Sequence, residues 1–357
     1  MKKVLSVLGA RPQFIKAAAV SRAINKADGI KEKIIHTGQH FDVNMSDVFF
    51  KEMNIPKPDY MLNINSLSHG AMTGRMLEGI EKAIIKEEPD IVMVYGDTNS
   101  TIAGALAAKK LHVKVAHVEA GLRSFNINMP EEVNRILTDR ISDILFCPTD
   151  TAISNLNKEG FDSFDIKIVK NGDVMRDAAL YYSQQSPQRS NILKKINIDE
   201  FILCTLHRAE NTDSPQRMES IVSALNDISK KIPIVLPLHP RTKKVLETLG
   251  LRLEVNIINP VGYFDMIELI KKSKLVVTDS GGLQKEAFFF SKHCVTLRDE
   301  TEWKELLDYG YNVLAGSSIV AIEQNIKKML TKKSDFSLDL YGTGSASEII
   351  TQELLRL

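Results

Sequence analysis

Short runs of β-branched residues recur along this chain of 357 residues, and a turn and a longer stretch with helical spacing follow each of them. This alternation is typical of βαβ units, which build a parallel sheet covered by helices. In the first half the predicted strands cover residues 3–8, 33–36, 91–95, 114–118, 144–147 and 166–169, with helical stretches such as 14–26, 70–87 and 98–111 between them. These elements amount to one complete doubly wound domain.

A second series of strands follows the polar stretch 183–190, which has no apolar face and is typical of a linker. Its predicted strands cover residues 201–206, 234–238, 255–258, 274–278 and 293–297. The fold class is therefore α/β, with two Rossmann-like parallel-sheet domains at residues 1–182 and 183–340. We expect a final helix, in 341–357, to pack back on the first domain. A chain of this length suits two cores of ordinary size.

The charges are nearly balanced, with 46 basic and 45 acidic residues, so no global field draws the chain to nucleic acid or to an anionic membrane. Cys147, Cys204 and Cys294 lie far apart in apolar runs, a pattern that favours neither disulfides nor a zinc cluster and suits a reducing cytoplasm. The first apolar run ends at Gly9, too early for an export signal or a membrane span. We expect a cytoplasmic protein that holds any anionic ligand at a local site.

Ionisable residues gather where predicted strands end, which is where open parallel sheets bind their ligands. Asp97 and Glu119 follow central strands of the first domain, and His207 follows the first strand of the second. A carboxylate in such a buried position is costly unless it is paired or functional. Each residue alone is more often a structural hydrogen-bonding group. Their joint occurrence at matching positions favours a site.

Two segments suit an anion. Asp279-Ser280-Gly281-Gly282 follows an apolar strand and opens a helix, so its amides can approach a phosphate; a plain turn capped by Ser280 explains the segment equally well. Arg11 and Lys16 place two cations at the start of the first helix, against the helix dipole, which favours binding of a diphosphate. No Gly-Lys-Ser/Thr ending makes a P-loop, and no Gly-x-Gly-x-x-Gly follows a strand, so NAD is not expected.

Two further patterns have structural explanations. Residues 129–135 read as a helix start, with Pro130 first and acidic residues in the opening turn. His36, His40 and Asp42 follow no known metal-ligand spacing, so no metal site is expected.

Six ordered motifs carry a family resemblance. They are Gly9-x-Arg11-Pro12-x-x-x-Lys16, Gly96-Asp97-Thr98, His117-Val118-Glu119-Ala120-Gly121-Leu122-Arg123, Pro130-Glu131-Glu132-x-Asn134-Arg135, His207-Arg208 and Asp279-Ser280-Gly281-Gly282-x-Gln284-x-Glu286. Over nearly its whole length the chain resembles the nonhydrolysing UDP-N-acetylglucosamine 2-epimerases, which share the fold of GT-B glycosyltransferases.

The resemblance implies a homodimeric enzyme that works in the cleft between its two domains. It assigns catalysis to Asp97, Glu119, Glu131 and His207. It assigns UDP binding to Arg11, Lys16, Arg135, Tyr263, Ser280, Gly281, Gly282 and Glu286.

The chemistry explains why such residues are needed. The hydrogen on C2 of an N-acetylhexosamine is not next to a carbonyl group, so direct removal gives an unstabilised carbanion. Elimination of UDP from C1 with loss of that proton gives a 2-acetamidoglycal, and return of UDP with protonation from the other face inverts C2. The route needs no cofactor, but it needs a cationic, amide-lined pocket and acid–base groups near the ring.

Departures from the family pattern leave the hexose open. Residues Thr301-Glu302-Trp303-Lys304-Glu305 stand where Thr-Glu-Arg-Pro-Glu is usual, so Trp303 replaces a cation expected near the nucleotide. This variant is similar to relatives that act on UDP-2,3-diacetamido-2,3-dideoxyglucuronic acid, which is the alternative to UDP-N-acetylglucosamine. Gln39-His40 matches a motif at an activating site of some bacterial members, and allostery stays open. Two other classes also stay open, a GT-B glycosyltransferase and a nucleotide-sugar binding protein without catalysis.

Overall fold

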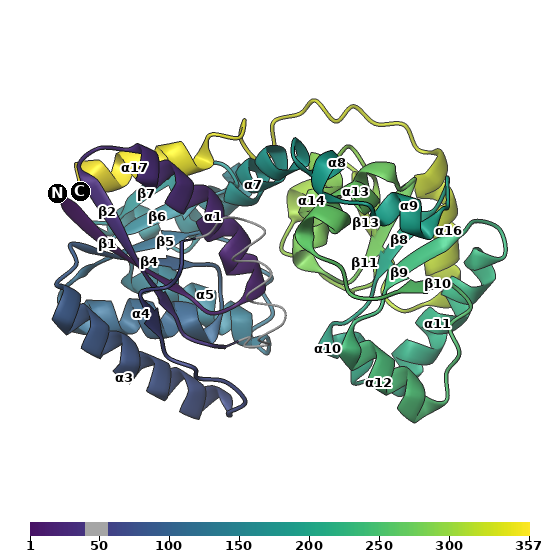
Figure 1. The fold of residues 1–357 in the computed structure, drawn as a ribbon, viewed down its shortest axis with the longest axis horizontal. Coiled ribbons are helices and arrows are strands. Elements are labelled where there is room, and N and C mark those ends of the chain that lie inside the picture. Colours follow the sequence, from purple (N-terminus) through teal and green to yellow (C-terminus); the bar gives the residue numbers. More distant parts are fainter. Residues whose placement is uncertain (40–55) are drawn as a thin grey trace. The chain divides into compact units, whose positions relative to one another are not determined.

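The chain forms two compact units in a computed structural model that describes residues 1–39 and 56–357, the side chain of Arg11 excepted. Unit 1 comprises Met1–Leu180 and Asp339–Leu357, and unit 2 comprises Tyr181–Leu338. Each unit holds its own parallel sheet flanked by helices, as the sequence predicted (Figure 1).

Unit 1 contains a sheet of seven strands in the order β3-β2-β1-β4-β5-β6-β7. The strands are β1 Lys2–Leu8, β2 Ile30–His36, β3 Tyr60–Met61, β4 Ile91–Tyr95, β5 Lys114–Val118, β6 Ile144–Cys147 and β7 Lys167–Lys170. The helices are α1 Arg11–Lys26, α3 His69–Glu87, α4 Asn99–Lys110, α5 Pro130–Ile141, α6 Asp150–Lys158, a short 3-10 turn at Phe161–Ser163, α7 Val174–Ser183, whose last residues belong to unit 2, and α17 Ala346–Arg356.

Unit 2 contains a sheet of six strands in the order β10-β9-β8-β11-β12-β13. The strands are β8 Ile202–Thr205, β9 Ile234–Pro237, β10 Asn256–Ile258, β11 Leu275–Thr278, β12 Cys294–Thr296 and β13 Asn312–Leu314. The helices are α8 Ser186–Arg189, α9 Ile192–Ile196, α10 Ala209–Thr212, α11 Pro215–Ser229, α12 Pro240–Leu249, α13 Tyr263–Lys272, α14 Gly281–Phe289, α15 Lys304–Asp308 and α16 Ile319–Thr331.

Both sheets follow the same winding rule. The strand order runs one way from the first strand of each sheet and then reverses, between β1 and β4 in unit 1 and between β8 and β11 in unit 2. In doubly wound sheets ligands bind beyond the carboxyl ends of the strands at this reversal. The loops after these four strands are therefore the places to look for a site.

The central strands of both sheets are buried on both faces, as a parallel sheet covered by helices requires. In β8, Ile202 and Cys204 pack into one apolar core, while Leu203 packs into a second core on the opposite face. Successive side chains of a strand alternate between faces, so one short strand serves both cores.

Residues 183–190 differ from the predicted linker. Residues 186–189 form α8, and the hydroxyl of Ser186 is buried and donates to Glu268 on α13 at 2.6 Å. The border between the units falls inside α7, at Leu180 and Tyr181. The packing uses hydroxyl groups instead of an apolar stripe, so hydrophobic periodicity gave no sign of it.

The C-terminal segment completes unit 1, where α17 packs against α1. The carboxylate of Asp177 accepts the amides of Ala346 at 3.1 Å and Ser347 at 2.7 Å, which satisfies the start of α17. Burial raises the pKa of Asp177, and these hydrogen bonds oppose the rise.

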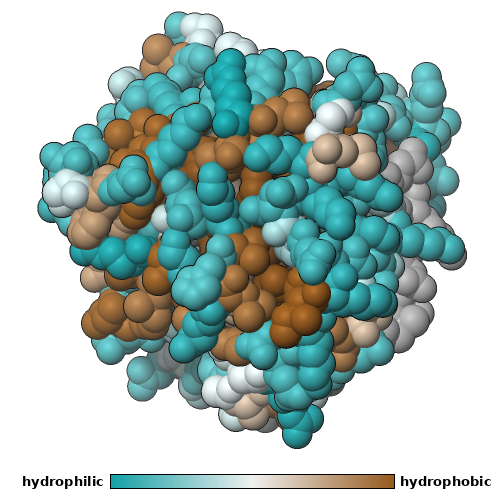
Figure 2. Space-filling view, turned by 90° about the vertical axis from the view of Figure 1, so that its left-hand side faces the viewer, coloured by the Kyte–Doolittle hydropathy of each residue, from teal (hydrophilic) through white to brown (hydrophobic). Residues whose placement is uncertain are grey.

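The three cysteines are buried and unpaired, and burial raises the pKa of each thiol, that of Cys294 to about 12. On the face drawn in Figure 2, apolar side chains gather in patches between hydrophilic ones, as is common on folded proteins. No helix in the described part of the chain is long and apolar enough to cross a membrane.

Candidate active site

The two loops at the reversal in unit 1 are tied together by Gln13. Its Oε1 accepts the amides of Gly9 at 2.7 Å and Ala10 at 3.0 Å, and its Nε2 donates to the carbonyl of Tyr95 at 2.7 Å. Gln13 is buried, so these bonds fix the β1–α1 loop against the end of β4. This role of Gln13 is not evident from the sequence, because a glutamine early in a helix is no signal by itself.

Asp97 follows β4 and lies against α5. Its carboxylate accepts from Arg135 at 2.5 Å, and its carbonyl accepts from the side chain of Asn134 at 2.9 Å. Glu131 lies three positions before Asn134 and four before Arg135, so it shares their face of the helix. Glu131 is partly exposed, and its side chain has no hydrogen-bond or ion-pair partner among the described residues. The structure thus brings two predicted residues, Asp97 and Arg135, into contact, and the third, Glu131, lies on the same face of α5 as Arg135.

Glu119 and Lys16 form an ion pair whose side chains are 9% and 8% exposed. Glu119 has a φ of 73°, a left-handed conformation that is costly for a residue with a side chain. A Cβ added to Gly96 would lie 3.4 Å from both Glu119 Oε2 and Lys16 Nζ, so the pair lies directly beside the turn before Asp97. The role of Lys16 toward a diphosphate stays a prediction, as does that of Arg11, whose side chain lies outside the described part.

The two acidic residues at the start of α5, Glu131 and Glu132, have different surroundings. Pro130 is the first helical residue, which confirms the predicted helix start. Glu132 is buried and accepts the amides of Ser124 and Phe125, both at 2.9 Å, and Arg135 at 2.8 Å. Glu132 therefore fixes the loop before α5, and Arg135 bridges it to Asp97.

The buried carboxylate of Asp279 organises the reversal in unit 2. It accepts the amides of His207 at 2.9 Å and Arg208 at 2.8 Å and the side chain of Asn211 at 3.2 Å. The loops after β8 and β11 are thereby held together. The His207 ring is partly exposed, its Nδ1 lies 3.3 Å from Asp279 Oδ1, and its centre lies 5.4 Å from that of His239.

The start of α14 is not capped by a side chain. Ser280 occupies the N-cap position, but its hydroxyl accepts none of the first amides, contrary to the plain capped turn considered above. A Cβ at Gly281 would collide with the carboxylate of Glu302, whereas one at Gly282 would meet no described atom within 4 Å. The open side of this helix start is thus at Gly282, where amides and the helix dipole favour an anion.

Lys285 lies beside Trp303, the residue that departs from the usual family pattern. Lys285 Nζ lies 3.9 Å from the centre of the Trp303 ring, and both side chains are buried. Trp303 stands where the family pattern has a cation, and in this chain a buried cation on α14, Lys285, lies against the Trp303 ring. Glu286 on α14 is largely buried, as is Tyr263, whose ring lies 5.8 Å from that of Tyr182. Their contacts with a nucleotide stay predictions.

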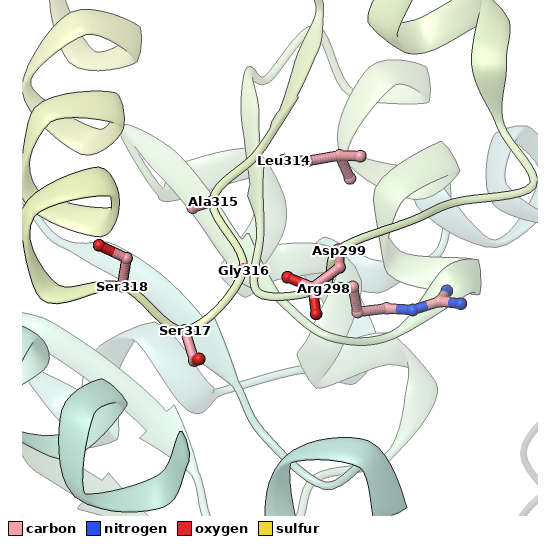
Figure 3. A pocket seen from close by; sticks show the side chains of 7 residues that line it. All are labelled: Arg298, Asp299, Leu314, Ala315, Gly316, Ser317 and Ser318. Atoms are coloured by element: carbon pink, nitrogen blue, oxygen red, sulfur yellow. The ribbon is translucent and has the colours of Figure 1, made fainter. Parts of the chain in front are cut away.

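A hollow of about 410 Å³ lies one strand further from the reversal, at the ends of β12 and β13. Figure 3 shows Ser317 and Ser318 on the loop after β13, and the side chain of Arg298 extending away from them. None of the predicted site residues is among the described residues that line it.

The described residues hold no cluster of three or more His, Cys, Asp or Glu side chains that suits a metal ion. His36 is buried, and its Nδ1 accepts the amide of Gly38 at 3.0 Å. His40 and Asp42, which were considered with it, lie outside the described residues, so the Gln39-His40 motif is described only at Gln39.

Two Rossmann-like units with this strand order are typical of the GT-B class, and solved structures of UDP-bound proteins have the same fold. A UDP-GlcNAc 2-epimerase of Methanocaldococcus jannaschii, in complex with UDP-GlcNAc and UDP, is 43% identical and superposes with a TM-score of 0.93 over 100% of both chains. MnaA of S. aureus with UDP is 34% identical, with a TM-score of 0.89 over 99% of this chain and 96% of that one. The predicted fold class is confirmed.

The family follows from the sequence comparisons. The model of the UDP-N-acetylglucosamine 2-epimerase family matches residues 22–355. A UDP-2,3-diacetamido-2,3-dideoxy-D-glucuronate 2-epimerase of Pseudomonas aeruginosa is 58% identical over 99% of this chain and 100% of its own length. The chain belongs to the UDP-N-acetylglucosamine 2-epimerase family and is an isomerase, as its motifs predicted.

Proposed function

We propose that the protein inverts C2 of UDP-2,3-diacetamido-2,3-dideoxy-D-glucuronate. The observation that carries this choice is the 58% identity to the Pseudomonas aeruginosa enzyme of that name, against 47% and 43% to UDP-N-acetylglucosamine 2-epimerases of two methanogens. Trp303, which departs from the usual family pattern, favours the same substrate. UDP-N-acetylglucosamine is the second candidate, because the family and several relatives carry its name.

The proposed reaction has two matched halves. A carboxylate removes the C2 proton, the C1–O bond breaks, and UDP leaves with the bonding electrons to give a 2-acetamidoglycal. UDP then adds back to C1 while a proton is delivered to the opposite face of C2. No net oxidation occurs, so the reaction needs acid–base groups and stabilisation of the leaving group.

Unit 1 supplies the carboxylates in this proposal. Asp97 lies against the face of α5 that carries Glu131, and its carboxylate accepts from Arg135. Glu131 has no ionic partner in the described part of the chain, which suits a group that gains and loses a proton. Glu119, neutralised by Lys16, completes the set.

Unit 2 supplies part of the proposed nucleotide contacts and His207 as a further acid–base group. The uncapped start of α14, at Ser280, Gly281 and Gly282, would hold the diphosphate, and its dipole would stabilise the charge on departing UDP. We assign the ribose to Glu286 on the same helix. The assignments to Arg11, Lys16, Arg135 and Tyr263 complete the proposed UDP site.

The test is NMR in deuterated buffer with each UDP-sugar and no acceptor. We expect deuterium at C2 together with the inverted sugar, and a higher kcat/KM for the diacetamido uronate than for UDP-N-acetylglucosamine. A glycosyltransferase would need an acceptor, and a binding protein would leave C2 unexchanged. Turnover of UDP-N-acetylglucosamine alone would overturn the substrate assignment and keep the reaction.

We also propose that the enzyme acts in the cytoplasm as a homodimer, as the family resemblance implies. Light scattering during size-exclusion chromatography is expected to give the mass of two chains. The mass of a single chain at micromolar concentration would contradict the assembly.

A further inference from the structure

His117, on β5, is fully buried, and both of its ring nitrogens are hydrogen-bonded. Nε2 lies 2.7 Å from the carbonyl oxygen of Gly96, and Nδ1 lies 2.7 Å from Oδ1 of Asp139. A carbonyl oxygen only accepts, so Nε2 must carry a proton. A neutral imidazole has one N–H, which would leave Nδ1 as an acceptor facing the carboxylate.

Asp139 has no proton to offer to Nδ1. Its Oδ2 accepts the amide of Gly121 at 3.1 Å and Arg123 at 2.7 Å, so this oxygen is an acceptor for two donors. Arg123 is a permanent cation, so its contact with Oδ2 favours the ionised form of Asp139 although the carboxyl group is fully buried. Asp139 is therefore an ionised acceptor, and Nδ1 must donate to it.

We propose that His117 is a buried imidazolium, protonated on both nitrogens, which acts as a positioning residue for Asp97. The protonation state stands on the geometry alone. Its kinetic consequence rests on the proposed function.

The surrounding charges support the imidazolium. Arg123 binds Glu159 through two bonds of 2.7 and 2.9 Å, so Glu159, Arg123, Asp139 and His117 form a row of alternating charges. If His117 were neutral, the carboxylates of Asp139 and Glu159 would face the single guanidinium of Arg123. Asp139 is fully buried, so an uncompensated negative charge there is strongly unfavourable. With an imidazolium the row sums to zero.

Other titratable groups nearby do not change this balance. Burial and the charge of Asp139 raise the pKa of Cys147, on β6, so its thiol is neutral. On the far side of Gly96, Lys16 and Glu119 neutralise each other.

The position of the imidazolium explains how it can act on the reaction. Gly96 has a φ of 62°, its amide donates to the carbonyl of Val118 at 2.9 Å, and its carbonyl accepts from His117. Both polar backbone groups of Gly96 are thus held by β5. Because the Gly96 carbonyl shares a planar peptide unit with the amide of Asp97, His117 fixes the direction in which Asp97 leaves the strand.

The protonation state is tested by NMR of the full chain labelled with ¹⁵N-histidine at neutral pH. The chain has eight histidines, and one is expected to show proton-bearing signals for both ring nitrogens. That pair of signals must be missing from the spectrum of His117→Gln. Neutron diffraction from wild-type crystals locates the same two protons without any variant. A bare Nδ1 or Nε2 on His117 by either method would overturn the proposal.

The positioning role is tested by two replacements. A Gln side chain reaches far enough to donate to the Gly96 carbonyl, whereas the shorter Asn does not. We expect His117→Asn to lower kcat on the order of 100-fold, since a displacement of about 1 Å has an effect of that size. KM should stay within about threefold, because binding groups remain. His117→Gln should retain more of kcat than His117→Asn.

His112→Asn is the matched control, because this exposed histidine lies just before the same strand and should leave kcat unchanged. Wild-type kcat in His117→Asn, or equal kcat in both replacements, would refute the positioning role. If the wild-type protein shows no C2 exchange with any UDP-sugar, the proposed function fails while the NMR and neutron results still decide the protonation state.

Discussion

Replacing Glu32 by Gln should stabilise the protein at alkaline pH. Glu32 lies on β2, and its Oε1 accepts the hydroxyl of Ser6 from β1. Burial raises its pKa from 4.5 to about 7, although the hydroxyls of Ser21 and Ser6 oppose the rise. In the unfolded chain this carboxyl group returns to its ordinary pKa.

The sign and size follow from linkage. Between pH 4.5 and about 7 the folded protein keeps a proton that the unfolded chain has released, so the free energy of unfolding falls as pH rises. At about 1.4 kcal/mol per pKa unit, the rise of the pKa from 4.5 to about 7 corresponds to a loss of roughly 3.5 kcal/mol, complete above pH 7. A neutral amide of the same shape escapes this loss. Glu32→Gln should therefore be on the order of 2 to 3 kcal/mol more stable at pH 8 and nearly equal at pH 5.

The assay must report on unit 1. The single tryptophan, Trp303, lies in unit 2, so its fluorescence is unsuitable. Urea unfolding followed by hydrogen exchange of β1 and β2 amides measures the correct unit. Glu78→Gln, at an exposed pair with Lys82 on α3, is the matched control and should change little at either pH. Equal effects of Glu32→Gln at pH 5 and pH 8, or a less stable variant at pH 8, would refute the reasoning.

Four further replacements, the last with a compensating second change, follow from the proposed site. Asp97→Asn and Glu131→Gln should lower kcat by about 10² or more while UDP still binds, since each removes an ionisable group and keeps its shape; steady-state rates and calorimetry with UDP decide this. Gly282→Ala should leave thermal stability unchanged or higher, because a Cβ there meets no described atom within 4 Å, yet weaken UDP binding if the diphosphate lies against this amide. Trp303→Arg restores the usual family residue but puts a second cation beside Lys285, so it should lower the melting temperature, and Lys285→Glu in the same chain should recover part of the loss.

Apolar runs predicted most of the strands, because a strand that is buried on both faces appears in the sequence as a continuous apolar segment. The predicted range 91–95 coincides with β4, and 114–118 with β5. The two missed strands, β3 and β13, have only two and three residues. The stretch 183–190 was predicted as a linker because serines are typical of loops, whereas in α8 the hydroxyl of Ser186 is used for packing against α13.

The proposed catalytic residues could be named from sequence motifs, whereas the residues that support them could not. Asp97 stood out because a carboxylate after a buried strand is costly unless it is paired or functional, whereas Glu131 was assigned only through the family resemblance, since its segment by itself reads as a helix start. His117 stood in a quoted motif without a role, since only the structure shows that a carbonyl and a carboxylate face its two nitrogens. The pairing of Lys16 with Glu119 joins residues far apart in sequence, and no local pattern reveals it.

Both units fix the loops at their strand-order reversal with one buried polar side chain, and the chemistry of each is dictated by what it must bind. Asp279 faces amides and an amide side chain, so a carboxylate suits it. Gln13 faces two amides on one side and the Tyr95 carbonyl on the other, so it needs an acceptor and a donor together.

Gln13→Glu should therefore fail in a way that depends on pH. The second carboxylate oxygen would face the carbonyl of Tyr95, an acceptor, which leaves buried groups unpaired at a cost of about 1 to 3 kcal/mol or more. Protonation of that oxygen restores a donor, so the loss of unfolding free energy should be larger at pH 8 than at pH 5. Gln352→Glu, exposed on α17, controls for the added charge in the same unit. Wild-type stability of Gln13→Glu at pH 8 would show that the two loops do not depend on this donor, and Asp97 would then need another anchor.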